Sequence, residues 1–295
     1  MDNSNQNYTF SKRVLANSFN RAANSYDSSA ILQNEVGSRL IERLELVKIE
    51  PQRIVDLGSG TGIFTAQLQA QYKKAKLLGI DLAWQMSALA KSKNRWLSKQ
   101  RFICADAESL PLADNSVELV FSNLMLHWIS NPDRLFREIH RVLVPGGLLM
   151  FTGFGPDTLK EMRQSWLQVD DNVHVNRFLD MHDVGDSLTN NGFEGAVMDN
   201  ETITMTYENI SQLHQDLHNL GEVNRNSGRN PCLTGKSRWN DYLQAYQQHR
   251  TSEGLFPASW EVVYGHAWAR QDLLPTQKSG HDDPLLIKKS SINQM

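Results

Sequence analysis

The sequence predicts an α/β fold built on a mostly parallel sheet, and three observations lead to this prediction. From Arg53 onward, short apolar runs alternate with stretches of helical periodicity, which is the pattern of βαβ units with helices on both faces of a sheet. A glycine-rich segment, Gly58 to Gly62, directly follows the first apolar run. The second and third runs end in aspartates, Asp81 and Asp106. Ligands of such open sheets bind at the carboxyl ends of the strands, where these residues are expected to lie.

Two helices are expected before the first strand. The first carries an apolar stripe at helical spacing, made of Phe10, Val14, Phe19 and Ala22. The segment Tyr26-Asp27-Ser28-Ser29 is expected to break this helix and to cap a second one, since aspartate and serine are favoured at helix starts. The stripe of the second helix is Leu32, Val36, Leu40 and Leu44. Residues 1–50 are therefore expected to form an N-terminal helical lid.

The main domain is expected to span residues 51–268. Its expected strands are RIVDLG, KLLGID, RFICAD, VELVFSNL and GLLMFTGF. The helical stretches between them run from Phe64 to Tyr72, from Met86 to Leu97 and from Pro132 to Val142. Gly146 and Gly147 are expected to form the turn into the fifth strand.

After Gly155 the pattern of expected secondary structure changes, and short strands no longer alternate with helices. Helices are expected over residues 156–169, 182–190 and 210–220, with a strand pair within FEGAVMDNETITMTY and a final strand SWEVVYGHAW. Residues 208–257 are expected to form a cap inserted before the last strand. Residues 269–295 are polar and lack sustained periodicity, so they are expected to form a flexible tail.

Composition argues against several classes of function. The 295 residues carry a formal net charge of −3, which gives no global basic field to hold nucleic acid. The two cysteines, Cys104 and Cys232, lack the spacing of a metal site, and no metal is expected. No apolar run reaches the roughly eighteen residues of a membrane span, and MDNSNQNYTF lacks the layout of a signal peptide. We expect a cytoplasmic protein that binds neither nucleic acid nor a membrane.

The segment IVDLGSGTG carries the clearest chemical signal. Gly58, Gly60 and Gly62, with Ser59 between the first two, let the backbone turn tightly and approach a nucleotide-like ligand closely. Asp56 lies two residues before this loop. A carboxylate there would repel the pyrophosphate of a dinucleotide, but it would suit a ligand that carries an ammonium group.

The two aspartates at later strand ends extend this assignment. Asp81, with Leu82 beside it, follows the loop by about twenty residues, where an acid can accept both ribose hydroxyls. Asp106 can receive an adenine amino group, with the backbone N–H of Ala107 as its neighbour. The sequence therefore offers binding partners for an amino acid, a ribose and an adenine, but none for a phosphate. This set describes S-adenosylmethionine.

The segment NLMLHW follows the fourth expected strand. Asn123, Leu124 and Met125 are expected to border the methionine moiety of the cofactor, because they lie at a strand end. His127 is a candidate general base. The alternative is that His127 only packs in the interior, because general-base chemistry needs a proton to remove and the substrate need not offer one.

These motifs together resemble those of the class I, seven-stranded methyltransferases. The resemblance covers residues 53–151 and rests on VDLGSGTG, GIDLA, ADAESLPLADNSVELVFSN and LVPGGLLM. It implies a Rossmann-like sheet in the order 3-2-1-4-5-7-6, with an antiparallel last strand, and S-adenosylmethionine as cofactor. Fold alone does not choose the methyl acceptor.

Further blocks narrow the acceptor. FNRAANSYD, FGPDTLKEMRQSW, DLHNLGEVNRN, LTGKSRW and WEVVYGHAW are similar to segments of the malonyl-acyl carrier protein O-methyltransferases of biotin synthesis, over residues 11–268. This resemblance implies methyl transfer to the free carboxylate of a malonyl thioester on acyl carrier protein or on CoA. Arginine hydroxylase-like assembly factors of respiratory complex I share part of these blocks, with or without catalytic turnover. A quinone-precursor C-methyltransferase would share the cofactor motifs and is a further alternative.

Two residues are candidates for contacts with the acceptor. Arg163 is expected to lean over the mouth of the cofactor site, where its planar guanidinium would orient the acceptor carboxylate. The alternative is a surface ion pair between Arg163 and Glu161 or Asp170. Tyr26 is expected to lie in a turn of the lid, where its hydroxyl would bond the acceptor oxygen or line the methyl site. Packing at a helix junction is the alternative for Tyr26.

A carrier protein also needs a docking surface, and carrier proteins are acidic. Between residues 222 and 239 the sequence places four cations against one acid, Glu222. The cations are Arg225, Arg229, Lys236 and Arg238. Complementary charge would steer the encounter of the two proteins. A solvated basic loop is the alternative.

Overall fold

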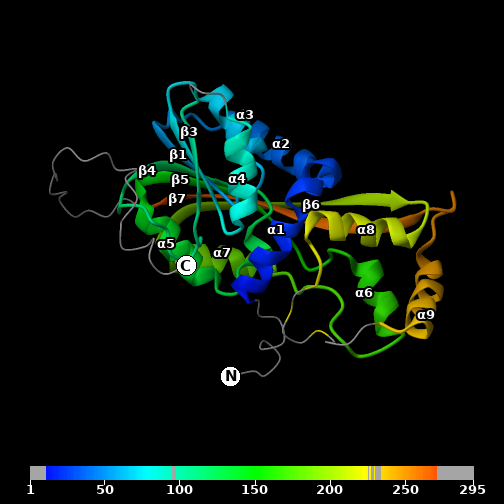
Figure 1. The fold of residues 1–295 in the computed structure, drawn as a ribbon. Coiled ribbons are helices and arrows are strands. Elements are labelled where there is room, and N and C mark those ends of the chain that lie inside the picture. Colours follow the sequence, from blue (N-terminus) through cyan, green and yellow to red (C-terminus); the bar gives the residue numbers. More distant parts are fainter. Residues whose placement is uncertain (1–10, 95–97, 225, 227–228, 230–233, 271–295) are drawn as a thin grey trace.

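The computed structural model describes residues 11–94, 98–224, 226, 229 and 234–270. A seven-stranded sheet in the order β3-β2-β1-β4-β5-β7-β6 forms its centre (Figure 1). The strands are β1 (Arg53–Leu57), β2 (Lys76–Asp81), β3 (Gln100–Cys104), β4 (Val117–Ser122), β5 (Leu143–Phe154), β6 (Phe193–Tyr207) and β7 (Phe256–Ala269). The pairs among β1 to β5 are parallel, while β7 is antiparallel to β5 and β6. The predicted strand order is therefore confirmed.

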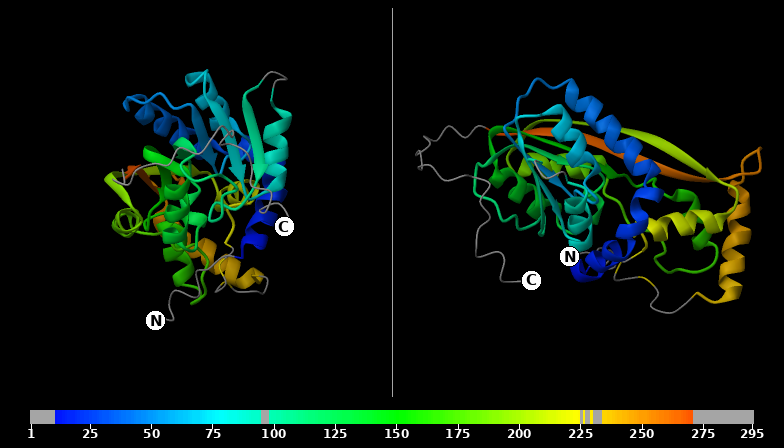
Figure 2. Two further views of the ribbon diagram at one scale, coloured as in Figure 1. Left: turned by 90° about the vertical axis from the view of Figure 1, so that its left-hand side faces the viewer. Right: turned by 45° about the horizontal axis from the view of Figure 1, so that its top comes forward.

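Helices cover both faces of this sheet (Figure 2). They are α1 (Lys12–Ser29), α2 (Ile31–Glu45), α3 (Ile63–Gln71), α4 (Trp84–Ser92), α5 (Pro132–Val142), α6 (Lys160–Leu167), α7 (Met181–Asn190), α8 (Ile210–Leu220) and α9 (Lys236–Tyr246). Short 3-10 turns lie at Leu126–Trp128 and Gln247–His249. None of the helices within the described ranges has the length and apolar character needed to cross a membrane.

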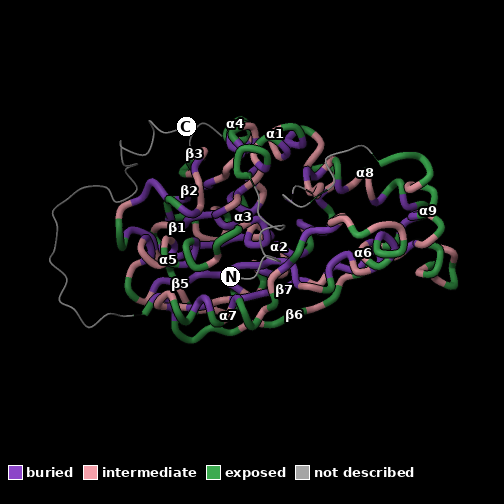
Figure 3. Tube along the Cα trace, turned by 90° about the horizontal axis from the view of Figure 1, so that it is seen from below, coloured by how far each residue is buried: buried purple, intermediate pink, exposed green. Residues whose placement is uncertain are grey.

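Two apolar cores result from the alternation of side chains along the strands. Ile54 and Leu119 point to the face covered by α2 and α3, whereas Val55 and Val120 point to the face covered by α5 and α7. Figure 3 shows the buried strands passing between the exposed outer stretches of the peripheral helices. The middle of the sheet is therefore filled by apolar packing, and polar groups for a site are expected at the strand ends.

The first helix is longer than the sequence predicted. Tyr26-Asp27-Ser28-Ser29 forms the last turn of α1 rather than a break, and α2 begins after Ala30 without a side-chain cap. The polar residues expected to cap find other partners: Ser28 Oγ donates to the carbonyl of Ser25, and Asp27 pairs with Lys93 at 2.6 Å. The expectation that Tyr26 lies in a turn is therefore wrong.

The segment FEGAVMDNETITMTY forms a single strand, β6, and the predicted strand pair is wrong. Gly195 and Asn200 resemble turn residues in sequence. In the structure Gly195, with φ 60°, lies at an irregularity of the β6–β7 register between Glu194 and Val197. Asn200 donates its side-chain amide to Glu261 on β7. The strand remains paired with β7 to Tyr207, as an exposed edge of the sheet.

At one end of the molecule, α6, α8 and α9 gather around the projecting ends of β6 and β7 (Figure 1). Leu159, Met162 and Trp166 are buried here, and Trp166 stacks on Tyr242 of α9 with ring centroids 4.2 Å apart. The segment 208–257 contributes α8 and α9. Its treatment as a cap, and that of residues 1–50 as a lid, stays a prediction, and most of the expected tail lies outside the described residues.

Candidate active site

A cavity lies at the carboxyl ends of β1, β2 and β4, beneath α1. The predicted residues on its wall are Tyr26, Gly58, Gly60, Asp81, Leu82, Asp106, Ala107, Asn123, Leu124 and Met125. Lys12, Phe19, Met86, Trp128 and Glu222 also line it, and the sequence analysis assigned none of these to the cofactor site. Because α1 supplies Lys12 and Phe19, the cavity lies between α1 and the strand ends of the sheet.

Glycine is required where the loop after β1 meets β4. Gly58 has φ 76°, and a Cβ at this position would lie 2.7 Å from Cβ of Met125. The N–H groups of Gly58 and Ser59 both donate to the carbonyl of Ile80, at 2.8 and 3.0 Å. The loop is thereby bound to β2, with its backbone exposed to the cavity at Gly58 and Gly60. Such close backbone approach is what a nucleoside ligand needs.

Asp81 is oriented by the same loop. Its carboxylate accepts the N–H of Gly60 at 2.9 Å and the N–H of Ala83 at 2.7 Å. Burial raises the pKa of Asp81 to about 6, so the group is mostly ionised at neutral pH. Each oxygen keeps acceptor capacity beyond its one backbone bond, which suits two neighbouring hydroxyls.

Asp106 lies at the other end of the cavity, opposite the start of α1. Its carboxylate accepts the N–H of Glu108 at 3.0 Å and pairs with Lys12 at 2.6 Å. Lys12 also pairs with Glu108. The lid is therefore attached by an ion pair to the carboxylate expected to receive an adenine amino group.

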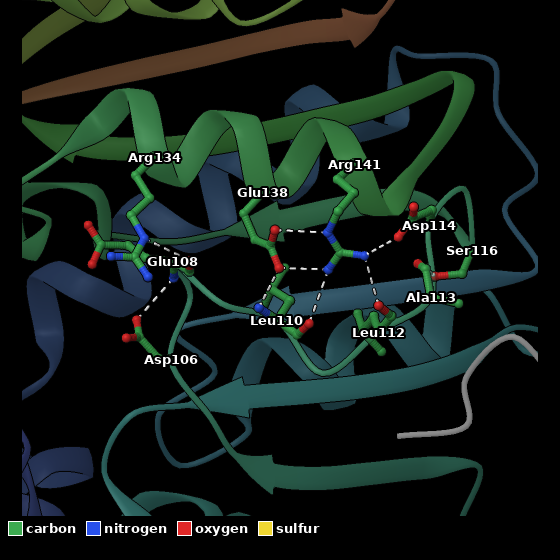
Figure 4. Close-up of polar contacts among 10 residues, drawn as sticks. All are labelled: Asp106, Glu108, Leu110, Leu112, Ala113, Asp114, Ser116, Arg134, Glu138 and Arg141. Atoms are coloured by element: carbon green, nitrogen blue, oxygen red, sulfur yellow. Dashed lines mark hydrogen bonds and ion pairs between the residues drawn. The ribbon is translucent and has the colours of Figure 1, made fainter. Parts of the chain in front are cut away.

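The segment after Asp106 is held against α5 by polar contacts (Figure 4). Arg134 donates to the carbonyl of Glu108 at 3.2 Å. Arg141 donates to the carbonyls of Leu110 and Leu112, at 3.1 and 2.9 Å, and pairs with Glu138. These contacts satisfy backbone groups of a loop that lacks regular structure. They fix the position from which Asp106 and Ala107 face the cavity.

The end of β4 is stabilised by a threonine on β5. The hydroxyl of Thr152 accepts the N–H of Leu124 and donates to the side-chain oxygen of Asn123, both at 2.8 Å. The amide of Asn123 donates to the carbonyl of Gln33 at 2.9 Å. Leu124 has φ 50°, a left-handed conformation that costs free energy in a residue with a side chain. This strained turn presents residues 123–125 to the cavity.

Three predicted cofactor residues do not line the cavity. Asp56 is 2% exposed, and it accepts the hydroxyl of Thr65 at 2.5 Å. Burial raises the pKa of Asp56 to about 7. Its carboxyl therefore joins β1 to α3, and the expected direct pairing with an ammonium group is not supported. Ser59 is buried under the loop, and Gly62 lies against Ala90 and Phe102.

Glu222 is the main functional candidate that sequence reasoning missed. It follows α8 and accepts the side-chain amide of Gln33 at 2.9 Å. The preceding carbonyl, that of Gly221, accepts the hydroxyl of Ser18 on α1. Burial raises the pKa of Glu222 to about 7. The block DLHNLGEVN contains this residue, but nothing within the block distinguishes a buried acid from the surface charges of residues 222–239.

A second cavity meets the first at Trp128 and Glu222, which line both. Its wall comes from the 3-10 turn after β4, α6, α8, α9 and β7. His127 lines this second cavity rather than the first, and burial lowers its pKa to about 3, so its ring is neutral at neutral pH. The ring packs against Phe154, with centroids 4.5 Å apart. A neutral, buried imidazole with aromatic neighbours favours a packing or hydrogen-bonding role over that of a general base.

Comparison with known proteins agrees with this arrangement. Residues 55–151 match the model of a methyltransferase domain. A malonyl-[acyl-carrier protein] O-methyltransferase from Gallionella capsiferriformans is 44% identical over 289 residues, covering 96% of this chain and 98% of that protein. One from Nitrosospira multiformis is 42% identical and covers 90% and 91%. The chain belongs to the malonyl-[acyl-carrier protein] O-methyltransferase family. The match spans the lid and cap as well as the sheet.

Solved structures support the same fold at lower identity. The YcgJ protein from Bacillus subtilis superposes with a TM-score of 0.57 and 18% identity, over 79% of this chain and 98% of its own. The Haemonchus contortus phosphoethanolamine N-methyltransferase 2, solved in complex with S-adenosyl-L-methionine, gives 0.52 and 16%, over 85% of this chain and 57% of its own. At such identities the likeness shows the fold alone.

In this malonyl-[acyl-carrier protein] O-methyltransferase family member, Arg163 does not reach the first cavity. Its guanidinium donates to the carbonyls of Pro156 and Thr158, at 2.8 and 3.0 Å. Leu159 has φ 54°, so α6 begins only at Lys160 and the chain before it lies within reach of Arg163. The side chain lines a separate hollow together with Asp171 and Arg177. The expected position over the cofactor mouth is therefore wrong, and Arg163 instead braces the turn before α6.

The predicted docking cations of this O-methyltransferase differ in their surroundings. Lys236 is exposed at the start of α9, and Arg229 is exposed in the preceding segment. Arg238 lies 3.6 Å from Asp170, so its charge is partly neutralised within the chain. Arg225 lies outside the described residues.

Proposed function

We propose that this chain transfers a methyl group from S-adenosylmethionine to the free carboxylate of a malonyl thioester on acyl carrier protein, an early step of biotin synthesis. The observation that carries the proposal is the relationship to malonyl-[acyl-carrier protein] O-methyltransferases over nearly the full length. The two adjoining cavities support it, because one suits the cofactor and the other leaves room for an acceptor.

The residues present fit the cofactor. Gly58 has no side chain where the ligand must approach, Asp81 offers two oriented oxygens to the ribose, and Asp106 lies where an adenine amino group can donate. When bound, S-adenosylmethionine supplies a methyl group on a positively charged sulfonium. Glu222, at the junction of the two cavities, places negative charge near that end of the site when ionised.

Methyl transfer to this acceptor does not require the protein to remove or donate a proton. A malonyl carboxylate is ionised at neutral pH, so its oxygen is a nucleophile without a general base. As the C–S bond breaks and the C–O bond forms, the sulfonium becomes a neutral thioether and the carboxylate becomes a neutral ester. No proton moves in this step. What the chain must supply is alignment of the two groups in a site closed to water.

Tyr26 and the rest of α1 are proposed to close the site to water. Tyr26 lines the first cavity from α1, and burial raises the pKa of its phenol, so the hydroxyl stays protonated and can donate a hydrogen bond. Phe19 of α1 lies edge-on to Trp128, with centroids 5.4 Å apart. The lid thus covers the place where the two cavities meet.

The acidic carrier protein is proposed to dock at the basic segment before α9, through Arg229, Lys236 and Arg225, with Arg238 contributing less because of Asp170.

The overall function is tested by incubating the protein with malonyl-acyl carrier protein and S-adenosylmethionine. A mass gain of one CH2 unit on the malonyl group is expected. Acetyl-acyl carrier protein lacks the free carboxylate and should gain nothing.

A further inference from the structure

The second cavity has a volume of about 300 Å³ and an aromatic wall. Trp166, Trp239, Trp260, Phe154 and Phe178 all line it. No lysine or arginine is among the described residues of this wall, and His174, which also lines it, pairs with Asp170 at 2.7 Å. Among these described residues, the groups that can receive an entering anion are neutral hydrogen-bond donors.

Such donors are present and lack partners. Nε1 of Trp260, Nε1 of Trp166 and both ring nitrogens of His127 are buried, without a hydrogen bond to any residue that the structure describes. The three side chains are only 3%, 4% and 7% exposed. A buried N–H without a partner costs about 1 to 3 kcal/mol, and three around one cavity call for an explanation. A bound ligand with acceptor oxygens would satisfy them.

Two of the side chains that carry these donors pack against the same aromatic ring. The rings of His127 and Trp260 both contact Phe154, with centroids 4.5 and 5.0 Å away. His127 lies two residues after the segment 123–125, which lines the first cavity. Glu222, an acid on this wall, also lines the first cavity.

We propose that this aromatic cavity is the acceptor site, and that the indole N–H of Trp260 and the imidazole N–H of His127 receive the free carboxylate of the malonyl group. The inference rests on the proposed function and deepens it. Preorganised N–H donors in a site that excludes water hold a carboxylate more firmly than they do in water. Methylation removes the negative charge, so the ester is bound less tightly than the acid and is released.

Binding of two closely related ligands tests this assignment. Affinities for malonyl-CoA and for its methyl ester are measured in the presence of S-adenosylhomocysteine, which prevents turnover. The wild-type protein is expected to prefer the acid. Trp260→Phe and His127→Phe keep the aromatic packing but remove the donors, and each is expected to reduce the preference by about tenfold. Trp84→Phe removes an exposed indole on α4, away from the lining of both cavities, and it should leave the ratio unchanged.

The outcomes separate the pocket assignment from the overall function. Unchanged acid-to-ester ratios in both Trp260→Phe and His127→Phe, or equal losses for the two ligands, would overturn the assignment. Unchanged affinity for S-adenosylhomocysteine shows that a variant is folded. A wild-type protein that methylates no malonyl thioester would instead refute the proposed function. Transfer by the wild type together with unchanged ratios in the variants would refute only the pocket.

Discussion

The carboxylate of Glu222 accepts a hydrogen bond from the side-chain amide of Gln33 at 2.9 Å. This contact joins α2 to the segment that follows α8, across 189 positions of sequence. The carboxylate lines both cavities. Helix α2 and the segment after α8 therefore meet where the two cavities adjoin, which is where the proposed methyl transfer would take place.

Glu222→Gln should weaken binding of S-adenosylmethionine more than that of S-adenosylhomocysteine. The first ligand carries a sulfonium charge that an ionised Glu222 attracts, and the second has a neutral thioether. Calorimetry on both ligands should show a loss of about tenfold for the sulfonium, equivalent to about 1.4 kcal/mol, and little change for the thioether. Equal losses would show that the residue only supports the structure.

Asp81→Ala should lower the affinity for S-adenosylmethionine by about tenfold or more, because two charge-assisted hydrogen bonds to the ribose are lost. Asp199→Ala is a matched control, since Asp199 pairs with Arg43 on the exposed face of β6, outside the first cavity. Titration calorimetry of the two variants provides the comparison. An Asp81 variant with wild-type affinity would remove this residue from the cofactor site.

The protein without cofactor should lose stability as the pH rises from about 4 to about 7. Burial raises the pKa of Asp56 and of Glu222 to about 7 in the folded state, well above their values in an unfolded chain. Between the two values the folded state binds more protons than the unfolded state, so the free energy of unfolding falls with increasing pH. Thermal melts across this range should show it, and Asp56→Asn should flatten the curve. A melting temperature that rises over the same range in both proteins would contradict the raised pKa values.

Charge reversal at the proposed docking surface should separate two substrates. Arg229→Glu combined with Lys236→Glu is expected to raise KM for malonyl-acyl carrier protein about tenfold, and to leave kcat/KM for malonyl-CoA near wild type. The dependence on ionic strength should weaken in parallel. Lys74→Glu, an exposed lysine between α3 and β2, serves as the control. Equal losses on both substrates in the double variant would argue against a docking role.

Local signals in the sequence were sufficient for the sheet and for much of the cofactor cavity. The loop at Gly58, the acid at Asp81 and the alternation of strands and helices each depend on short-range chemistry, and the structure places them as expected. The order 3-2-1-4-5-7-6 came from resemblance, because the residues alone do not fix which strands pair.

The remaining errors have tertiary causes. Arg163 was placed over the cofactor by assuming a helix from residue 156, but the left-handed Leu159 delays α6, and nearby backbone carbonyls accept the guanidinium. Glu222 is held in the site by a hydrogen bond from Gln33, which is far away in the sequence. Asp27, in the last turn of α1, pairs with Lys93, which is 66 positions away in the sequence. Periodicity and spacing carry no information about such distant partners.

The most direct test of the central claim is intact-mass analysis of malonyl-acyl carrier protein after incubation with S-adenosylmethionine and either the wild-type protein or Asp81→Ala. We predict a gain of one CH2 unit with the wild type, located on the malonyl group by fragmentation, and a much slower gain with the variant. A wild-type protein that binds S-adenosylmethionine yet leaves the malonyl group unchanged would contradict the proposed acceptor.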